Sequence, residues 1–307
     1  MGDYRSEGGE RGGDFGAHVA QDESCAPPTE GSPLRFDQIG YWSEIKLDIL
    51  REYAAAYSKI LSGTKEASFY HIYIDAFAGP GIHVSKTTGE PVVGSPLNVL
   101  SVQPPFREYH FIDLDGDKVA FLKAAIGNRD DVHLYEGDCN VKLLTEVFPK
   151  VKYSDYRRGL CVLDPYGLHL KWAVLQEAAH MKTLEIFLNF PVADMNRNVF
   201  WRHPEGVDEG DINRMNEFWG DDSWKNVAYA TVPTLFGTSE EKASVEEVAK
   251  AFERRLKEKA GFAYVANPIP MRNTKGVILY YLFFASQKPV AKKIVDAIFD
   301  KYRSFAR

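Results

Sequence analysis

Short apolar runs alternate with amphipathic segments through the middle of the chain, between residues 70 and 190. Apolar runs of about four to eight residues between turn signals are typical of buried strands, and apolar positions three and four apart are typical of helices. Because the two kinds of segment alternate, the pattern predicts right-handed βαβ units around a parallel sheet. The predicted strands are Tyr70–Ala76, Glu108–Ile112, Val132–Tyr135, Leu160–Leu163 and Leu184–Phe190.

Amphipathic segments precede and separate these strands. The first has Trp42, Ile45 and Ile49 on one side, as a helix packed on a core requires. We expect a loop at 81–96, and we expect Asp117 rather than Asp115 to cap the helix that starts near Lys118. The predicted helices are Tyr41–Ile60, Lys118–Ile126, Leu143–Phe148 and Trp172–Ala179.

The alternation ends after Pro191. Residues 194–240 are rich in Asn, Asp, Arg and Trp, and we interpret them as an insertion or lid. Residues 241–307 are expected to complete the core or to form a small winged-helix-like unit. Their predicted elements are a charged helix at Val245–Lys259, two β-like runs at Phe262–Pro270 and Val277–Ala285, and a helix at Val290–Tyr302. The second run is nearly all apolar, as a fully buried strand should be.

These patterns together predict an α/β fold with a Rossmann-like core at residues 34–193, an inserted lid and a C-terminal antiparallel hairpin. Residues 1–33 are rich in Gly, Glu, Asp and Ser and carry few apolar residues, so we expect a disordered acidic tail there.

Composition excludes several classes of protein. Of the 307 residues, 45% are apolar, which suffices for a sizeable core. No apolar run approaches the roughly 18 residues of a membrane span, and no signal pattern opens the chain, so we expect a cytoplasmic protein. Cys25, Cys139 and Cys161 are too widely spaced for a disulfide framework or a zinc site. A net charge of −6 argues against a whole-surface nucleic-acid binder, although a local basic groove is compatible with it.

The first strand ends in an acidic residue and a glycine-marked turn. Asp75 is followed by Gly79 and Gly81, which allow close backbone approach to a ligand. The Gly-Lys-Ser/Thr of a phosphate-binding loop is absent, and a carboxylate at the turn suits a ligand with an amine or sugar hydroxyls, such as S-adenosylmethionine. The alternative is an ordinary turn that binds nothing. A nicotinamide dehydrogenase is disfavoured because Val84 stands where the third glycine of its motif belongs.

Three further strands also end in aspartates. Asp113 follows the second strand, Asp138 the third and Asp164 the fourth. In a parallel sheet these ends share one edge, where ligands bind. An acid after the second strand suits ribose hydroxyls, and one after the third suits an exocyclic amine. Each aspartate alone could instead cap the following helix.

The fourth strand runs into Asp164-Pro165-Tyr166-Gly167. The aspartate could accept a hydrogen bond from a substrate amino group, and the tyrosine could stack on a planar ring. We therefore take Asp164, Pro165 and Tyr166 as the predicted catalytic residues. The alternative is a strand-terminating turn with Pro and Gly in their favoured places.

The span from about Tyr41 to Phe305 resembles the three-Cys-motif partner proteins (TcmP), which are similar to class I S-adenosylmethionine-dependent methyltransferases. The stretches that carry the resemblance are Trp42–Leu50, Tyr73–Gly81, Gly94–Pro96, Phe111–Asp115, Leu163–Gly167 and Leu279–Ser286. It implies a class I methyltransferase sheet, S-adenosylmethionine as the cofactor, and a partner protein with a cysteine motif.

The resemblance also implies roles for individual residues. Asp75, Gly79 and Gly81 would hold the methionine end of the cofactor, Asp113 the ribose and Asp138 the adenine. The adjoining Phe77 and Cys139 are placed in the same predicted site. Methyltransferases of base amino groups usually have two prolines in the acceptor motif, whereas this chain has only Pro165 and places Tyr166 one position earlier.

Other polar residues have a functional and a structural interpretation. Cations and aromatic rings interleave within 194–240 and could bind single-stranded nucleic acid, although a segment packed on its own tryptophans is the preferred interpretation. These residues are Arg197, Trp201, Arg202, His203, Arg214, Trp219 and Trp224. His169 could be a general base, and Arg272 with Lys275 could contact phosphate, but each also fits a structural or solvated role.

The predicted function is therefore an S-adenosylmethionine-dependent methyltransferase that acts on a nucleic-acid base amino group and requires a cysteine-motif partner. The alternative is a non-catalytic or partner-dependent interaction module that keeps the methyltransferase fold.

Overall fold

The computed structural model describes residues 36–64, 69–201, 204–234, 237–273 and 275–303. The predicted tail at 1–33 lies outside the described residues, as do Arg202 and His203. No helix in these ranges is long and apolar enough to span a membrane.

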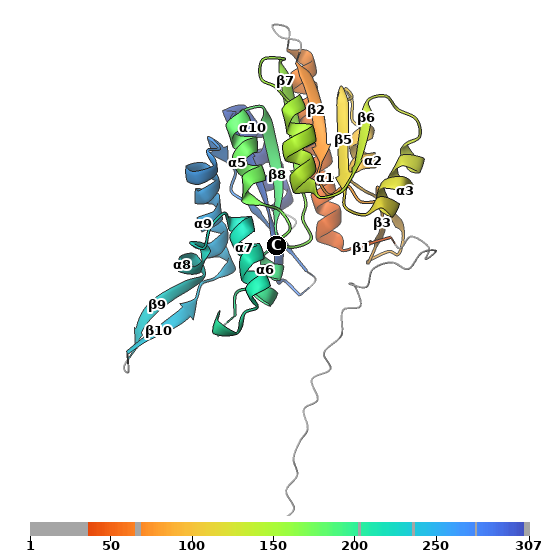
Figure 1. Ribbon diagram of the computed structural model, residues 1–307. Coiled ribbons are helices and arrows are strands. Elements are labelled where there is room, and N and C mark those ends of the chain that lie inside the picture. The colour runs from red at the N-terminus through yellow and green to blue at the C-terminus, as the bar shows by residue number, and fades with distance from the viewer. Residues whose placement is uncertain (1–35, 65–68, 202–203, 235–236, 274, 304–307) are drawn as a thin grey trace, which may run out of the picture. The chain divides into compact units, whose positions relative to one another are not determined.

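A single large sheet forms the centre of the described chain (Figure 1). Its order is β11-β13-β8-β7-β2-β5-β6, and β12 pairs with β13. Strands β6, β5, β2, β7 and β8 are mutually parallel, while β13 runs antiparallel to β8. The bounds are β2 Tyr70–Asp75, β5 Glu108–Asp113, β6 Val132–Glu136, β7 Arg157–Leu163, β8 Leu184–Phe190, β11 Tyr264–Val265, β12 Ile269–Arg272 and β13 Ile278–Ser286. The predicted α/β fold with a mostly parallel sheet is confirmed.

Helices cover both faces of this sheet, because each central strand buries side chains on both sides. On one face α1, α2, α3 and α10 share an apolar cluster with the strands, and on the other face α4, α5, α7, α8 and α9 do so. The bounds are α1 Tyr41–Gly63, α2 Ser95–Leu100, α3 Gly116–Ile126, α4 Cys139–Lys142, α5 Trp172–Met181, α7 Glu209–Trp219, α8 Trp224–Ala228, α9 Val245–Arg255 and α10 Pro289–Arg303. A π-helical turn, Leu143–Val147, extends α4, and a second, Leu256–Ala260, extends α9.

Helix α1 shows how the sequence pattern produces the packing. Ile45, Ile49, Tyr53 and Tyr57 recur every four residues and are all buried. This spacing keeps them on one face of the helix, against the sheet and α10. Lys46, near the start of the helix, lies at the carboxyl edge of the parallel strands, and Tyr57, near its end, lies at their amino edge. The helix thus runs from one edge of the sheet to the other.

The cap prediction for α3 was wrong. The Asp115 carboxylate accepts hydrogen bonds from the backbone N–H groups of Asp117 (2.9 Å) and Lys118 (3.3 Å), so Asp115 is the N-cap. Asp117 lies in the first turn of the helix, where its negative charge interacts favourably with the positive end of the helix dipole. Part of the expected loop at 81–96 is also ordered, because β3 (Ile82–Ser85) pairs with β4 (Pro91–Val93) and with β1 (Gln38–Ile39).

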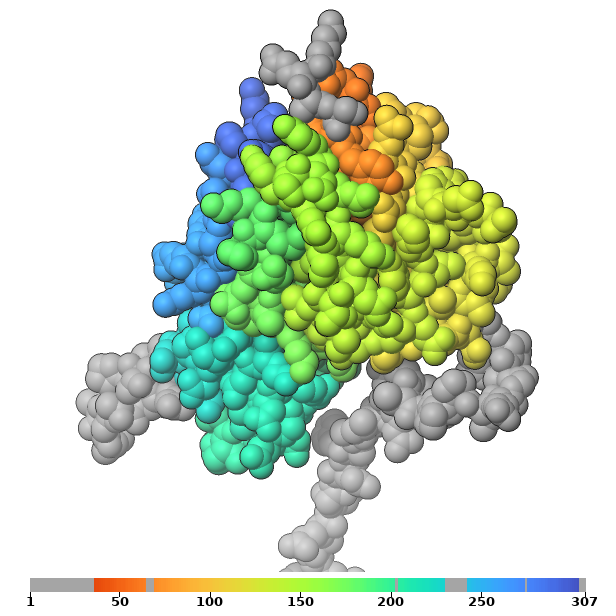
Figure 2. Space-filling view, turned by 45° about the horizontal axis from the view of Figure 1, so that its top comes forward, coloured from red at the N-terminus to blue at the C-terminus, as the bar shows by residue number. Residues whose placement is uncertain are grey.

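The segment after β8 is helical at first and then extended. It contains α6 (Val192–Asn198), a short 3-10 turn at Pro204–Gly206, α7, α8 and the hairpin of β9 (Tyr229–Thr234) and β10 (Gly237–Lys242). Trp219 and Trp224 are buried in the cluster that includes α5 and α9. Figure 2 shows the teal part of this segment lying against the green part that holds α5. The lid function of 194–240 stays a prediction.

Candidate active site at the carboxyl edge of the sheet

A cavity of about 300 Å³ opens where β2, β7 and β8 end. The strands are parallel, so the loops that follow them meet at this edge. Helices α1, α2 and α6 and strands β1, β3 and β13 supply the remaining walls. The lining residues include Lys46, Phe77, Ala78, His83, Ser95, Asp164, Tyr166, Asn189, Asp194, Arg197 and Tyr280.

The turn after β2 is held by Asp75, which is fully buried. Its carboxylate accepts hydrogen bonds from Phe77 N (3.2 Å) and Ser95 Oγ (2.5 Å). Burial raises the pKa of Asp75 to about 7, although both hydrogen bonds oppose the rise. Asp75 thus sits behind the cavity and positions two residues, Phe77 and Ser95, that line it.

Gly79 and Gly81 adopt the backbone conformations that only glycine tolerates readily, with φ of 63° and 79°. A Cβ at Gly81 would lie 2.8 Å from Leu122 Cδ1, so this glycine lets α3 approach the turn. A Cβ at Gly79 would meet only His83 Cε1, at 3.9 Å. Gly79 is therefore the glycine with an open side for a ligand.

Asp113 ties the turn to the neighbouring strand. Its Oδ2 accepts a hydrogen bond from Gly79 N at 2.7 Å, and its Oδ1 accepts one from Asp115 N at 2.9 Å. A carboxylate has about four acceptor positions, so room for sugar hydroxyls is left. The structure thereby brings together Asp75, Gly79 and Asp113, as the sequence predicts.

The third predicted strand end is less accessible. Asp138 is exposed and caps α4, accepting hydrogen bonds from Asn140 N (2.7 Å) and Asn140 Nδ2 (2.8 Å). Cys139 is buried, and burial raises the pKa of its thiol to about 12, which leaves it a weak nucleophile. Asp113, Asp138 and Cys139 are not among the described residues that line the cavity.

The turn after β7 meets a lysine that the sequence analysis missed. The Lys46 ammonium forms an ion pair with the Asp164 carboxylate and lies 5.3 Å from the centre of the Tyr280 ring. Burial is the largest single influence and disfavours the charged lysine, but Asp164, Tyr280 and Asp75 together outweigh it, so the pKa of Lys46 is raised. Pro165 is buried, and its carbonyl accepts a hydrogen bond from Asn189 Nδ2 at 3.2 Å.

Tyr166 is the most exposed of the predicted catalytic residues, with 71% of its surface accessible. Its hydroxyl donates to Asp37 Oδ2 at 3.2 Å, and Lys118 lies over its ring at 5.9 Å. Tyr166 and Tyr280 also line a wider groove of about 940 Å³ that adjoins the cavity. Tyr41, Trp42, Lys86 and Arg272 line the same groove.

Three buried polar atoms at the cavity lack a hydrogen-bond partner among the described residues. They are His83 Nδ1, Asn189 Oδ1 and Asp194 Oδ2. A buried polar atom without a partner costs about 1–3 kcal/mol, so these atoms mark positions where a ligand or water can supply the missing hydrogen bonds. Burial lowers the pKa of His83, which favours the neutral imidazole.

A weak signal for Asn189 was present in the sequence, because it interrupts the apolar run of β8 one residue before its end. Lys46 similarly interrupts the buried face of α1. Asp194 and His83 gave no comparable signal. The side chain of His169 is exposed and is not among the described residues that line the cavity. Its backbone carbonyl accepts a hydrogen bond from Asn140 Nδ2.

No family model matches the chain, and a search of curated proteins found no match. Several solved structures are distantly similar. A Legionella pneumophila protein of the family DUF519 is 10% identical, with 82% of this chain and 91% of that chain covered and a TM-score of 0.42. A candidate S-adenosylmethionine-dependent methyltransferase of Listeria monocytogenes is 13% identical, with 80% and 97% covered and a TM-score of 0.41. The methyltransferase domain of bacterial CtHen1 is 11% identical, with 80% and 100% covered and a TM-score of 0.39.

Proposed function

We propose that this protein is an S-adenosylmethionine-dependent methyltransferase whose acceptor is an amino nitrogen. The observation that carries the proposal is the pair of unpartnered acceptor atoms, Asn189 Oδ1 and Asp194 Oδ2, beside the glycine-marked turn after β2. An amino group donates two hydrogen bonds, which matches two acceptors without partners.

The residues divide into a cofactor side and an acceptor side. Asp113 and the open face of Gly79 would hold the cofactor, while Asp75 keeps the turn in place. When bound, the cofactor supplies an electrophilic methyl group. Asn189 and Asp194 would bind the N–H groups of the acceptor and direct the nitrogen toward the turn, and Asp194 or water would take the released proton.

Nucleic acid is the acceptor class that we propose for this site. The exposed ring of Tyr166 stands where the cavity meets the wider groove, and Lys86 and Arg272 line that groove. Aromatic rings that stack on bases, combined with cations that contact phosphates, are the usual elements of single-strand binding. The requirement for a three-Cys-motif partner belongs to this proposal and rests on the sequence resemblance alone.

A second function is favoured by one observation. Lys46 already pairs with Asp164, so the carboxylate predicted to receive the substrate amine is occupied in this structure. A site that keeps this pair would act as a partner-dependent module, in which a second chain must displace Lys46 before transfer occurs.

The test is transfer of a tritiated methyl group to total RNA and total DNA, with and without cell extract to supply a partner. We expect transfer by the unmodified protein and its loss in Asn189→Ala, with cofactor affinity retained by calorimetry. Transfer that is equal in the variant would remove Asn189 from the acceptor site. Absence of transfer under every condition, with the cofactor still bound, would favour the interaction module.

A further inference from the structure

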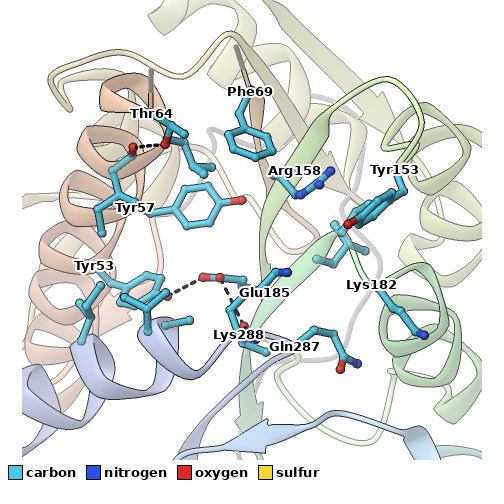
Figure 3. Close-up of a pocket in the computed structure, with 18 residues that line it drawn as sticks. Tyr53, Tyr57, Thr64, Phe69, Tyr153, Arg158, Lys182, Glu185, Gln287 and Lys288 are labelled. Atoms are coloured by element: carbon cyan, nitrogen blue, oxygen red, sulfur yellow. Dashed lines mark hydrogen bonds between the residues drawn. The ribbon is translucent and has the colours of Figure 1, made fainter. Parts of the chain in front are cut away.

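A second cavity lies at the opposite, amino edge of the parallel strands. It measures about 320 Å³ and is enclosed by the end of α1, the starts of β7 and β8, and α10. Figure 3 shows side chains from these elements converging on it. None of its described lining residues is shared with the cavity at the carboxyl edge.

The body of this amino-edge cavity is apolar. Leu61, Leu184 and Ile294 contribute aliphatic surface, and Phe69 and Tyr153 contribute aromatic rings. A hollow of this size between packed helices and a sheet would hold a small organic molecule rather than a macromolecule.

Two buried hydroxyl groups at this cavity lack a hydrogen-bond partner among the described residues. They are Tyr57 Oη and Thr183 Oγ1. Tyr57 is 6% exposed, and in Figure 3 its hydroxyl points into the cavity toward the side where Arg158 stands. Leaving such groups unpaired is costly, and a hydroxyl can donate to a ligand oxygen.

The charged groups around the cavity favour an anion. Arg158 stacks on Tyr153 (4.3 Å from the ring centre) and Phe69 (4.9 Å), while Lys182 and Lys288 are exposed at the cavity. None of the three cations forms an ion pair within the described ranges. Among the described residues that line the cavity, Glu185 is the one acid, and its carboxyl group already accepts hydrogen bonds from Tyr53 (2.5 Å) and Ser286 (3.3 Å).

We propose that the amino-edge cavity binds a small amphipathic carboxylate, with its aliphatic or aromatic body among the apolar side chains and its carboxylate facing Arg158, Tyr57 and Thr183. This inference is independent of the proposed methyl transfer, because the two cavities share no described residue.

Affinity for such an anion should depend on pH through Glu185. Burial raises the pKa of Glu185 to about 7, so the like charge that opposes the ligand is removed as the pH falls through 7. The other titratable and charged groups that face this cavity with Glu185 are Tyr53 and Tyr57 from α1, Tyr153 and Arg158 before and in β7, Lys182 before β8 and Lys288 after β13, together with the hydroxyl group of Ser286 at the end of β13. Octanoate should therefore bind more tightly at pH 6 than at pH 8.

The experiment is calorimetric titration of the full chain with octanoate and 3-phenylpropionate, alongside the neutral octanamide and inorganic phosphate. We expect both carboxylates to bind, and octanamide and phosphate to bind at least tenfold more weakly, since each lacks either the charge or the apolar body. Tyr57→Phe, which removes only the hydroxyl, should weaken octanoate binding about ten- to hundredfold, as loss of one hydrogen bond to a charged group does. Arg158→Gln should weaken it more.

Asn189→Ala, in the other cavity, should leave octanoate binding unchanged. Equal affinity for octanamide would overturn the anion preference. Affinity that is unchanged in both Tyr57→Phe and Arg158→Gln, or absence of binding by either carboxylate, would overturn the site.

Discussion

The four strand-end aspartates differ in their partners, and the partners decide what each can do. Asp75 is buried behind the turn after β2, Asp138 is committed to capping α4, and Asp164 is paired with Lys46. Asp113 holds Gly79 in place and keeps free acceptor positions beside it. Among the four, Asp113 is therefore the carboxylate to which the proposed function gives the sugar of a cofactor.

Replacing Asp113 should weaken cofactor binding. Asp113→Ala removes charged acceptors and should reduce the affinity for S-adenosylmethionine by roughly 1–3 kcal/mol, measured by calorimetry. Asp117→Ala is the matched control, because Asp117 is an exposed carboxylate in the first turn of α3. Thermal unfolding should show that both variants are folded, and equal affinities in the two would contradict this role for Asp113.

Tyr166 should act on the acceptor rather than on the cofactor. Its ring is exposed at the junction of the cavity and the groove, so Tyr166→Ala should reduce methyl transfer to nucleic acid by a factor that corresponds to ~1–3 kcal/mol of stacking. Tyr166→Phe keeps the ring and should retain most of the transfer. If the phenylalanine variant loses as much as the alanine variant, stacking is not the role of this residue.

For individual residues, the sequence predicted those positions that follow from the order of residues along the chain. An acidic residue at the end of a parallel strand must lie at the ligand-binding edge, so Asp75, Asp113 and Asp164 were predictable. The partner of Asp164 was not, because Lys46 lies 118 residues away in another element. The unpartnered oxygen atoms of Asn189 and Asp194 likewise depend on which neighbours the fold supplies.

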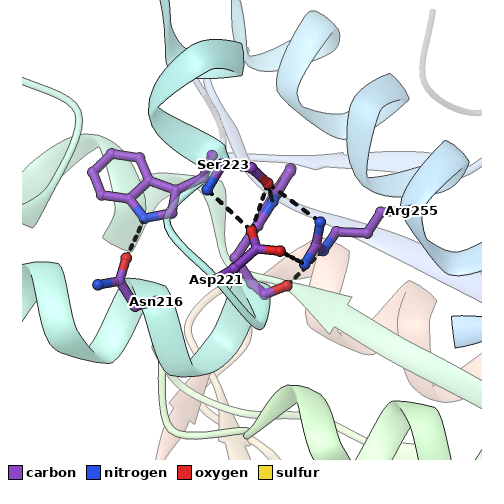
Figure 4. Close-up of polar contacts among 6 residues, drawn as sticks. Asn216, Asp221, Ser223 and Arg255 are labelled. Atoms are coloured by element: carbon purple, nitrogen blue, oxygen red, sulfur yellow. Dashed lines mark hydrogen bonds and ion pairs between the residues drawn. The ribbon is translucent and has the colours of Figure 1, made fainter. Parts of the chain in front are cut away.

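Among the elements, α7, α8 and α9 are joined by one arginine. Figure 4 shows Arg255 facing the loop between α7 and α8, where its Nη2 pairs with Asp221 at 2.7 Å. Its Nε donates to the Trp219 carbonyl at 2.6 Å, and its guanidinium lies 4.8 Å from the Trp172 ring centre. The arginine therefore fixes the post-β8 segment to the core through contacts that sequence periodicity does not reveal.

Removing this arginine should destabilise the fold. Arg255→Met retains the aliphatic stem but loses the hydrogen bonds, and should lower the free energy of unfolding by about 1–3 kcal/mol in urea. Arg254→Met is the matched control, since Arg254 is exposed one position earlier, and should change stability by less than about 0.5 kcal/mol. Equal effects in the two variants would show that the segment is held by its tryptophans alone.

Helices and strands were predictable where the apolar pattern was clear, as in α1 and the five parallel strands. The residues at which these elements begin and end were harder to predict. Asp115 and Asp117 both precede the apolar positions of α3, and only the backbone geometry decides which of them caps the helix. The pairing of β3 with β1 was also hidden, because it joins segments separated by α1 and β2.

Across the whole molecule, two acids on the central strands share an unusual electrostatic setting: Asp75, which is buried at the carboxyl edge, and Glu185, which is half-buried at the amino edge. Burial raises both pKa values to about 7. A raised pKa means that the folded chain favours the protonated acid over the ionised one. The contribution of each acid to the free energy of unfolding is therefore fully present below pH 4, which is about the pKa of the same acid in the unfolded chain. That stability is lost as the pH rises through 7.

Glu185→Gln should flatten this pH dependence. Between pH 5 and pH 8.5, the unmodified protein should lose stability relative to the variant by on the order of 3 kcal/mol, measured as free energies of unfolding in urea at each pH. Glu258→Gln, which alters an exposed glutamate, should parallel the unmodified protein. A difference between Glu185→Gln and the unmodified protein that does not change with pH would show that Glu185 is ionised throughout.

The proposed function requires the carboxyl edge of the sheet to bind S-adenosylmethionine. The most direct test is calorimetry of the full chain with S-adenosylmethionine and, side by side, with NAD. We expect a dissociation constant in the micromolar range for S-adenosylmethionine, which corresponds to a binding free energy of about −8 kcal/mol, and no comparable binding of NAD. A folded protein that gives no heat with S-adenosylmethionine or its demethylated product, or that binds NAD more tightly, would contradict it.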